Sequence, residues 1–482
     1  MFDHQHSLDP SDWDAFRRFS HQALDDMLDY IAGIRRQPVW QTADAATEGK
    51  FRTGLPREPR PLNETYAEFQ QHILPYAVGN AHPGFMGWAH GGGNVVGMLA
   101  EMLAAGLNAN LGGRDHIPIA VEQQVVRWMA ELFSFPSDAS GLFVTGSSLA
   151  NFIAILVARM AALGPSVRSG GLQSQSQTLV AYASTGTHSC VAKALDMSGL
   201  GASNLHPIGV DANLRIDTVA LQQAIRADRA AGKLPFCVIG NAGTVETGAI
   251  DDLNALADIC HREQVWFHVD GACGALGIMS ATLKPLYAGI QRADSLALDF
   301  HKWAQVPYDA GFVLVRDRRL HQATFASPAP YLGRAQRGMS AGSPWPCDYG
   351  PDLSRNFKAL KVWFTLQVYG ADRLGEMMDR ACQLARYLEQ RIAREPELEL
   401  LAPVPLNIVC FRYRSEHAVN ELNAALVIAL QESGIVAPSS THINGQAALR
   451  AAIFNHRTSQ VEIDALCDTT LKFGRAIKLG GA

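Results

Sequence analysis

The chain has 482 residues, 48% of them hydrophobic and 18% charged, which is typical of a globular enzyme of about two or three domains. The hydrophobic fraction is too high for a disordered protein, and 42 glycines are too few for a collagen-like one. The formal net charge of −5 provides no basic surface for nucleic acid or an anionic membrane.

Targeting segments and metal motifs are not expected in this chain. Residues 1–6 lack the basic and apolar regions of a signal peptide, and no stretch of about 18 apolar residues is long enough to span a membrane. The eight cysteines show no C-x-x-C spacing. We therefore expect reduced thiols in a cytoplasmic protein, and no metal centre.

The N-terminal part of the chain is predicted to be helical. Apolar residues between Ser11 and Arg36 recur at steps of three or four, and prolines flank the segment on both sides. Residues 38–63 are rich in proline, glycine and charge, and are expected to form an irregular connector. A second helix is expected at about 65–77.

From about residue 120 onward, short apolar runs alternate with helix-sized amphipathic segments. The runs predicted to be strands are 142–145, 179–183, 236–239, 265–269, 295–298 and 312–315. Helices are predicted between most of them, for example at 150–162 and 219–230. This alternation indicates an α/β fold in which helices cover both faces of a parallel sheet. Ligands of such sheets bind beyond the carboxyl ends of the strands.

The C-terminal third begins with a long irregular segment. Residues 327–352 are rich in proline and glycine, and a loop of this length inside a compact domain is often functional. Beyond it we expect a long helix, two short strands and a last helix, at 371–394, 406–412, 447–454 and 459–477. These elements together form an α+β module.

Two charged residues follow neighbouring predicted strands. Asp270 ends one strand, and Lys302 lies about one helix and one strand further along the chain. Each alone has a plain structural explanation, as a strand-end carboxylate or a member of an ion pair. Together they suit pyridoxal 5'-phosphate (PLP), because a lysine forms a Schiff base with this cofactor and an aspartate keeps its ring nitrogen protonated.

Three further strand ends add weaker signals. Residues 146–148 lie between a strand and a helix start, where backbone N–H groups and hydroxyls bind phosphate, although serine is also a routine helix cap. His188 follows another strand, where an imidazole can stack on a flat cofactor, transfer protons or cap a loop. The glycine- and threonine-rich segment 240–248 is by itself an ordinary turn.

The order and spacing of these segments resemble the group II PLP-dependent decarboxylases, the aromatic-L-amino-acid decarboxylase family, over nearly the whole chain. The similarity is strongest at Thr-His-Ser (187–189), Gly-Thr (243–244), His-Val-Asp-Gly-Ala (268–272), Asp-Phe-His-Lys-Trp (299–303) and Phe-Lys-Ala-Leu-Lys-Val-Trp-Phe (357–364). The resemblance implies that Lys302 forms the Schiff base, that Asp270 pairs with the ring nitrogen and that His188 stacks over the ring.

The resemblance also implies the other members of the site. The residues at or beside the phosphate would be Gly146, Ser147, Ser148 and His301, and those near the ring would be Thr244 and Ala272. The substrate-pocket segment 82–88 would contribute His82, Phe85 and Trp88. Glu122 lies in another matching stretch, and the resemblance gives it no role.

The fold implied is fold-type I of the PLP enzymes, α/β with a mostly parallel central sheet. We expect an N-terminal helical segment (1–80) that wraps the partner of a homodimer, a large PLP-binding domain (81–370) and a small C-terminal domain (371–482). The active sites would lie at the subunit interface. The N-terminal amphipathic segment, which has no nearby strand to cover, is consistent with a dimer.

The chain departs from the family at a loop tyrosine that protonates the substrate's α-carbon in the partner subunit's active site. Counting forward from Tyr331 places Trp345 at the tyrosine position, and counting back from Leu353 places Pro346 there. Tyr349 fills the catalytic role only if a gap of three or four residues is allowed.

This departure leaves two products open. Protonation of the carbanion gives an amine, whereas capture by oxygen gives an aldehyde, as in the family's aldehyde synthases. Because His188 is retained, we favour ordinary decarboxylation of an L-amino acid, and Phe85 and Trp88 favour an aromatic one.

The substrate class and the activity itself are also open. The substrate could be histidine, aspartate or glutamate, but an acidic substrate calls for a pocket arginine that the sequence does not locate. The chain could also be a catalytically silent homologue. The intact set of Asp270, Lys302 and His188 argues against that.

Overall fold

The computed structural model describes residues 7–327 and 333–480, and the chain divides into two compact units after Pro38. The first unit holds one long helix, α1 (Trp13–Ala32), followed by a 3-10 turn at Ile34–Arg36. The carboxylate of Asp12 caps α1 by accepting a hydrogen bond from the backbone N–H of Ala15 at 2.9 Å. The helix predicted at 11–36 is confirmed.

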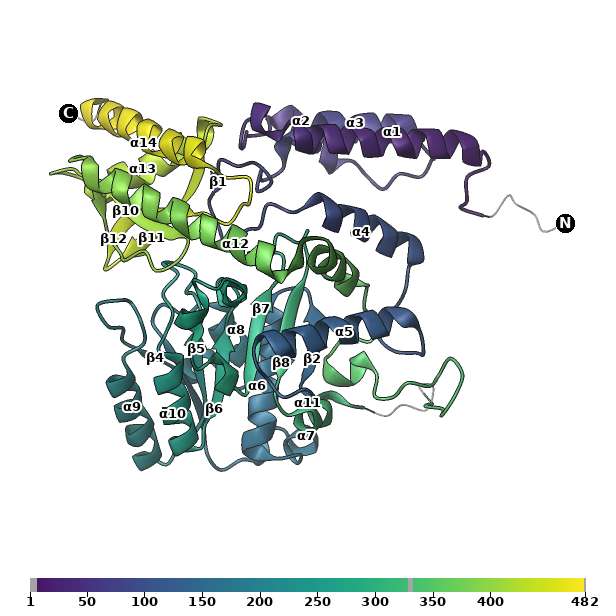
Figure 1. The fold of residues 1–482 in the computed structure, drawn as a ribbon, viewed down its shortest axis with the longest axis vertical. Coiled ribbons are helices and arrows are strands. Elements are labelled where there is room, and N and C mark those ends of the chain that lie inside the picture. The colour runs from purple at the N-terminus through teal and green to yellow at the C-terminus, as the bar shows by residue number, and fades with distance from the viewer. Residues whose placement is uncertain (1–6, 328–332, 481–482) are drawn as a thin grey trace. The chain divides into compact units, whose positions relative to one another are not determined.

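A seven-stranded sheet forms the core of the second unit, in the order β2-β8-β7-β6-β5-β3-β4 (Figure 1). Its strands are β2 (Ser140–Val144), β3 (Leu179–Ser184), β4 (Leu205–Ile208), β5 (Leu234–Asn241), β6 (Trp266–Asp270), β7 (Ser295–Asp299) and β8 (Gly311–Val315). Neighbouring strands from β4 to β7 are parallel, and β8 runs antiparallel to both β2 and β7. The predicted α/β fold with a mostly parallel sheet is confirmed.

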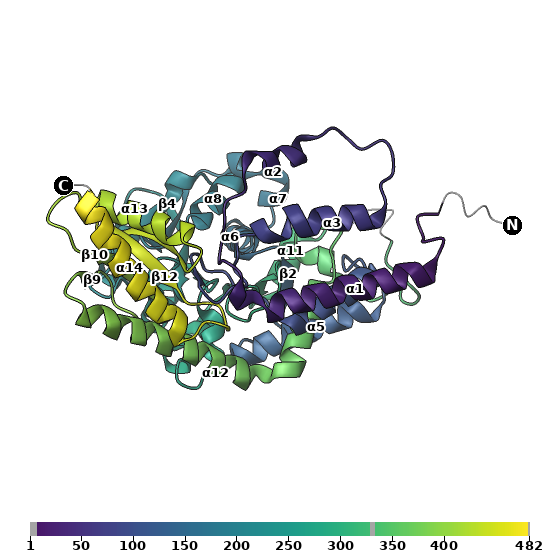
Figure 2. The same cartoon turned by 90° about the horizontal axis from the view of Figure 1, so that it is seen from above.

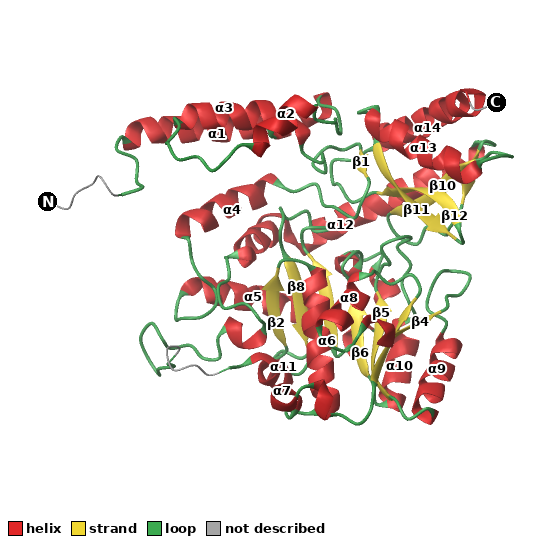
Figure 3. Cartoon of the chain, turned by 180° about the vertical axis from the view of Figure 1, so that it is seen from behind, coloured by secondary structure: helices red, strands yellow, loops and turns green. Residues whose placement is uncertain are grey.

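Helices cover both faces of this sheet, which Figures 1 and 3 show from opposite sides. One face packs against α5 (Ile117–Leu132), α9 (Thr218–Ala230) and α10 (Leu253–Glu263), and the other against α6 (Ser147–Leu163) and α8 (Cys190–Met197). Along β3, Val180 and Tyr182 pack on the first face, whereas Ala181 and Ala183 pack on the second. Apolar residues on both sides explain the unbroken apolar runs in the sequence.

A second sheet, of order β1-β11-β12-β10-β9, lies in the C-terminal part of the chain. Its strands are β1 (Phe85–Met86), β9 (Leu398–Leu400), β10 (Ile408–Tyr413), β11 (Ala437–Ile443) and β12 (Gln446–Ala452). The helices packed on it are α12 (Lys358–Arg394), α13 (Val419–Glu432) and α14 (Gln460–Gly480), which Figure 2 shows around the sheet. Gly370 interrupts α12 with φ 73°, at the point where the sequence predicts a new helix.

The remaining helices are short or lie in the first part of the second unit: α2 (Ala45–Gly49), α3 (Leu62–His72), α4 (Val95–Leu107), α7 (Val167–Gly170) and α11 (Arg318–Phe325). The helix expected at 65–77 is α3 followed by a 3-10 turn at Leu74–Tyr76.

No helix within 7–327 and 333–480 is long and apolar enough to cross a membrane. The domain limits near residues 80 and 370 stay predictions, and β1 joins the C-terminal sheet by pairing with β11.

A buried ion pair gives Glu122 a structural role. Its Oε1 lies 2.6 Å from Nη2 of Arg355, and both side chains are at most 5% exposed. The same guanidinium donates hydrogen bonds to the carbonyl oxygens of Leu111 and Phe143, both at 3.0 Å. Arg355 therefore ties α5 to β2 and to the segment that precedes α12.

We expect Arg355→Met to lower the free energy of unfolding by about 3–5 kcal/mol, because it leaves the Glu122 carboxylate buried without a charged partner. Urea and thermal denaturation of the cofactor-free protein measure the change. Arg226→Met, on an exposed position of α9, is the matched control and should change stability by less than about 0.5 kcal/mol. Equal stability of the two variants would contradict the role of the ion pair.

Candidate active site

A cavity of about 470 Å³ lies beyond the carboxyl ends of the parallel strands. The predicted site residues that line it are Trp88, Gly146, Ser147, Ser148, His188, Asp270, Ala272, His301 and Lys302. They follow β1, β2, β3, β6 and β7, and thus come from segments far apart in the sequence. The volume suits a cofactor together with a small substrate.

Asp270 ends β6 and is 5% exposed. Its Oδ1 accepts a hydrogen bond from the backbone N–H of Ala272 at 3.1 Å, and its Oδ2 accepts one from Nδ2 of Asn151 at 3.1 Å. Burial raises the pKa of Asp270 above its ordinary value, while these donors and the positive charge of Lys302 oppose the rise. Asn151, on α6, is a site residue that the sequence motifs do not indicate.

Lys302 is paired with a second carboxylate, that of Asp299, at 3.0 Å. Burial alone would lower the pKa of Lys302, but neighbouring acidic groups, Cys273 and Asp299 first among them, raise it overall. Burial likewise works to raise the pKa of Asp299, but the charge of Lys302 outweighs it and lowers that pKa. The two carboxylates are therefore distinct, since Asp299 holds the lysine and Asp270 faces the cavity with its own donors.

The turn before α6 is the candidate phosphate site. Ser147 already donates both its backbone N–H and its hydroxyl to Asp299, each at 2.7 Å. The hydroxyl of Ser148 and the backbone N–H groups of residues 145, 146 and 148 are then the donors available to an anion at the start of the helix. A side chain at Gly311 would come within 2.3 Å of Gly146, so this close approach of two strands requires glycine.

Two imidazoles flank the cavity. His188 accepts a hydrogen bond at Nδ1 from the backbone N–H of Cys190 at 3.1 Å, and partial burial lowers its pKa. His301 accepts one at Nδ1 from the backbone N–H of Ala310 at 3.0 Å, and burial lowers its pKa to about 4. Both rings are neutral near pH 7 and carry their hydrogen on Nε2.

These residues fit PLP. A lysine amine, a buried carboxylate with its own donors, a neutral imidazole and a helix start meet in one cavity. The cavity also contains an orphaned polar atom, because Nδ1 of His90 is buried and has no hydrogen-bond partner within the described residues. Among the described residues no cluster of three or more histidine, cysteine or acidic side chains is placed to hold a metal ion.

Comparison with known proteins decides the family. The pyridoxal-dependent decarboxylase conserved domain matches residues 47–414. The chain belongs to the pyridoxal-dependent decarboxylase family. It is 34% identical to the aromatic-L-amino-acid decarboxylase of Bacillus atrophaeus, over 93% of each chain. The predictions of family, PLP as cofactor and a carboxy-lyase acting on amino acids are confirmed.

Two more distant relatives extend the comparison. The phenylacetaldehyde synthase of Arabidopsis thaliana is 29% identical, over 92% of this chain and 93% of that protein. The crystal structure of Oryza sativa TDC with PLP and tryptamine has the same fold, with a TM-score of 0.88 and 23% identity, over 98% of this chain and 100% of that one. The two proteins thus share the fold although fewer than a quarter of their residues are identical.

Three predicted residues lie behind the cavity and do not line it. Thr244 accepts a hydrogen bond at Oγ1 from the backbone N–H of Ala249 at 3.1 Å, whereas its neighbours on either side reach the cavity. Phe85 is buried in β1, and its ring stacks on that of His90 at 5.8 Å. His82 is buried and accepts a hydrogen bond at Nδ1 from a backbone N–H two residues on.

The structure does not bring Tyr349 to the cavity of its own chain. Tyr349 is 3% exposed, and its hydroxyl accepts a hydrogen bond from Nε of Arg318 at 2.9 Å. Trp345 is 1% exposed, and its indole N–H donates to the carbonyl of Ala341 at 2.7 Å. Tyr331, the reference residue for the forward count, lies outside the described residues. All three candidates for the loop position, Trp345, Pro346 and Tyr349, are therefore buried in this conformation.

Arg450, on β12, lines the cavity and is a second site residue that the sequence motifs do not indicate. Its guanidinium donates to the carbonyl oxygens of Gly87 at 2.8 Å, Glu246 at 3.2 Å and Val245, and to the hydroxyl of Ser439 at 3.2 Å. Most of its N–H groups are thus engaged by the protein itself. Because Arg450 lies in a separate sheet about 150 residues after Lys302, no local motif points to it.

We expect Lys302→Ala to abolish the visible absorption band that PLP acquires on the protein and to reduce turnover by at least about 10³-fold, because the covalent attachment point is lost. Absorption spectra after PLP addition, together with CO2 release, measure both effects. Lys193→Ala, at an exposed position of α8, is the control and should keep the band and the rate. A band of normal intensity in Lys302→Ala would contradict the assignment.

Proposed function

We propose that this chain removes the α-carboxyl group of an aromatic L-amino acid as CO2 and releases the corresponding amine. The observation that carries the substrate class is the set of aromatic side chains around the cavity, where Trp88, His90 and Tyr308 lie together with Lys302. The rings of Trp88 and His90 are 6.0 Å apart, and those of His90 and Tyr308 are 5.6 Å apart. Flat apolar surfaces of this kind favour an aromatic side chain.

Acidic substrates have less support. Arg450 is the one arginine among the described residues that line the cavity. Its hydrogen bonds to backbone carbonyls and to Ser439 leave little of the guanidinium for the side-chain carboxylate of aspartate or glutamate. An aromatic substrate needs no such partner.

PLP, when bound, accepts the electrons of the broken bond to the carboxyl carbon. In this proposal Lys302 holds the cofactor, Asp270 keeps the ring nitrogen protonated and residues 146–148 bind the phosphate. Asp299 stabilises the ammonium of Lys302 whenever that lysine is free, because the two lie 3.0 Å apart. His188 covers the ring as a neutral imidazole.

Formation of an amine requires a proton donor for the α-carbon. We assign this role to Tyr308 rather than to the buried Tyr349. The side chain of Tyr308 lines the cavity, and its ring packs at 4.3 Å on that of His301, the residue before Lys302. Partial desolvation at the cavity raises the pKa of Tyr308 above its ordinary value, so its hydroxyl keeps its proton at neutral pH. Tyr308 is 46% exposed, so it regains its proton from water after each transfer, and His90 lies in edge contact with its ring.

The second candidate function is an aldehyde synthase. The specific observation in its favour concerns the position of the family's loop tyrosine. Counting forward from Tyr331 places Trp345 there, and both Trp345 and Tyr349 are buried. One relative with 29% identity is a phenylacetaldehyde synthase. An aldehyde synthase would consume oxygen and form peroxide.

We also propose a cytoplasmic homodimer with active sites at the interface. Helix α4 exposes Leu99, Met102, Leu103 and Leu107, each at 42–61%, which is a large apolar face for one helix. The N-terminal segment 1–80 would wrap the partner.

The eight free cysteines, seven of them buried, suit a reducing compartment such as the proposed cytoplasm.

A product assay tests the proposed function. PLP-loaded protein is incubated in air with single L-amino acids, and products are identified by mass spectrometry. We expect tryptophan, tyrosine or phenylalanine to give the amine and CO2 in equal amounts, with no product from aspartate, glutamate or histidine. An aldehyde with ammonia and peroxide would overturn the amine product, and turnover of an acidic substrate would overturn the substrate class.

We expect Tyr308→Phe to reduce amine formation by about 10²-fold and to raise the share of aldehyde, because the α-carbon loses its proton donor. The ratio of aldehyde to amine in air measures the effect independently of overall rate. Tyr387→Phe is the control, since its hydroxyl binds Asp464 at 2.8 Å in the C-terminal part of the chain. An unchanged ratio in Tyr308→Phe would exclude this tyrosine as the donor.

A further inference from the structure

A continuous chain of hydrogen bonds runs behind Asp270, through residues that the proposed function does not use. The indole N–H of Trp266 donates to Oγ of Ser295 at 2.8 Å, and the same Oγ lies 2.9 Å from Nδ1 of His268. Nε2 of His268 lies 2.7 Å from Oδ1 of Asn151. Nδ2 of Asn151 donates to Oδ2 of Asp270 at 3.1 Å. Asn151, His268 and Ser295 are fully buried.

The two end groups, the indole of Trp266 and the carboxylate of Asp270, fix the direction of every hydrogen bond between them. An indole N–H only donates, and a carboxylate only accepts. Asn151 therefore turns its amide N–H toward Asp270 and its carbonyl oxygen toward His268, which must donate from Nε2. A neutral ring with its hydrogen on Nε2 has a bare Nδ1, which accepts the hydroxyl hydrogen of Ser295. Each donor points toward Asp270.

His268 is the member that prevents reversal. Burial lowers the pKa of His268 to about 4, so the ring is neutral and has one N–H to donate. If the amide of Asn151 turned over, its carbonyl oxygen would face the carboxylate of Asp270, and its NH2 group would face the N–H of His268. The contact with Asp270 would be repulsive. The NH2 group could bond to His268 only if the ring moved its hydrogen to Nδ1, and the buried hydroxyl of Ser295 would then lose its acceptor.

We propose that His268 is a positioning residue, which together with Ser295 and Trp266 holds the amide of Asn151 with its N–H toward Asp270 and so keeps Asp270 ionised as the partner of the cofactor's ring nitrogen. The proposal rests on the assignment of PLP to this cavity. It concerns the electronic state of the cofactor rather than the choice of substrate or product.

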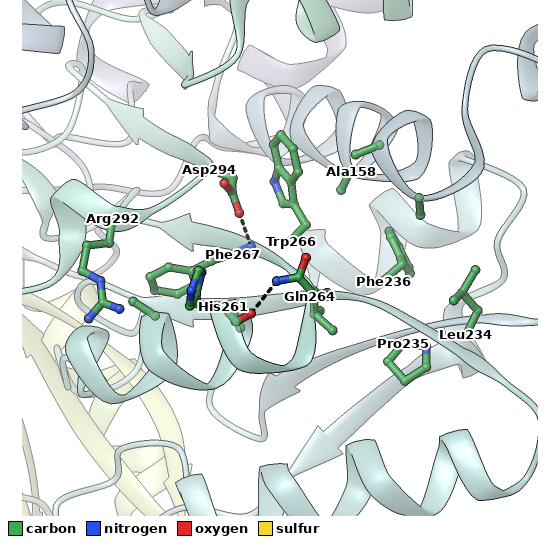
Figure 4. Close-up of a pocket in the computed structure, with 15 residues that line it drawn as sticks. Ala158, Leu234, Pro235, Phe236, His261, Gln264, Trp266, Phe267, Arg292 and Asp294 are labelled. Atoms are coloured by element: carbon green, nitrogen blue, oxygen red, sulfur yellow. Dashed lines mark hydrogen bonds between the residues drawn. The ribbon is translucent and has the colours of Figure 1, made fainter.

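The far end of the chain lies at the opposite edge of the sheet. Trp266 begins β6, is half-buried and lies beside a second cavity of about 520 Å³, shown in Figure 4. In that figure the carboxylate of Asp294 accepts a hydrogen bond from the backbone N–H of Phe267, at 2.8 Å, and fixes the start of the strand. The chain therefore links the carboxyl edge of β6 to its amino edge.

Other groups also act on the carboxylate of Asp270. Burial raises its pKa, and the charges of Lys302 and of any protonated His188 lower it. The buried thiols of Cys190 and Cys273 lie nearby, and the pKa of each is raised by burial and by the charge of Asp270. All four side chains are kept in variants of Trp266, His268 and Ser295, so these variants leave the other influences on Asp270 in place.

The test compares His268→Leu with His268→Gln in the PLP-loaded protein. Donors to a carboxylate favour its charged form, so loss of the ordered Asn151 donor raises the pKa of Asp270. We expect the acid-side transition in the visible spectrum of the bound cofactor to move up by about one pH unit in His268→Leu, and PLP affinity in equilibrium dialysis to fall about tenfold. His268→Gln, which can donate to Asn151 and accept from Ser295, should restore most of both.

Two milder variants keep the test decisive if His268→Leu fails to fold. Ser295→Ala and Trp266→Phe should shift the transition in the same direction by a smaller amount. Trp363→Phe is the matched control, because its indole N–H also donates a bond of 2.8 Å, to Gln124, away from Asp270. The proposal would be overturned if the variants of His268, Ser295 and Trp266 all showed the same transition pH as Trp363→Phe. It would also be overturned if His268→Leu and His268→Gln had equal transition pH and equal PLP affinity.

The same titration separates this proposal from the proposed function. A wild-type protein that acquires no visible PLP band would refute the assignment of PLP to this cavity and, with it, both proposals. A normal band with the wrong product would refute the proposed function alone, because the spectrum is recorded without substrate.

Discussion

Buried charge at the carboxyl edge of the large sheet is the constraint on which the active site depends. Asp270 and Asp299 are nearly withdrawn from water and the side chain of Lys302 is 18% exposed, and charged groups in such places are tolerated only when each has a partner. Asp299 satisfies Lys302 and also caps α6, whereas Asp270 is satisfied by Ala272 and Asn151. This division of partners leaves one carboxylate for the lysine and another for a cofactor.

The rest of the structure supports that arrangement from a distance. The Glu122–Arg355 pair holds β2, whose end becomes the phosphate turn, and Arg450 brings the C-terminal sheet to the cavity. Trp88, His90 and Tyr308 complete the cavity with aromatic surface and exchangeable protons. In the mechanism we propose, the proton source is a tyrosine a few residues after the lysine rather than a residue of the 327–352 loop.

Whether a strand can be predicted from the sequence depends on how apolar and how regular its residues are. Buried strands such as β6 and β7 are mostly apolar runs that end in polar residues, so the sequence indicates the strands and also Asp270 and Lys302, which lie at their ends. β4 contains Pro207 on the sheet edge, and β11 is largely polar, so neither has a strand pattern.

Contacts made across the fold are not predictable in this way. Asn151 lies within a helix and Arg450 within a remote strand, where only the fold reveals their contact with the site. The interpretation of Tyr349 as a catalytic residue rests on its distance along the loop, and that distance does not determine whether a side chain is buried.

The assignment of Lys302 as the residue that carries PLP is tested most directly by borohydride reduction of the PLP-loaded protein. Peptide mass spectrometry then identifies the lysine to which the cofactor is attached. We expect one labelled peptide, and we expect it to contain Lys302. Label on another lysine, or no stable label at all, would contradict the site described above.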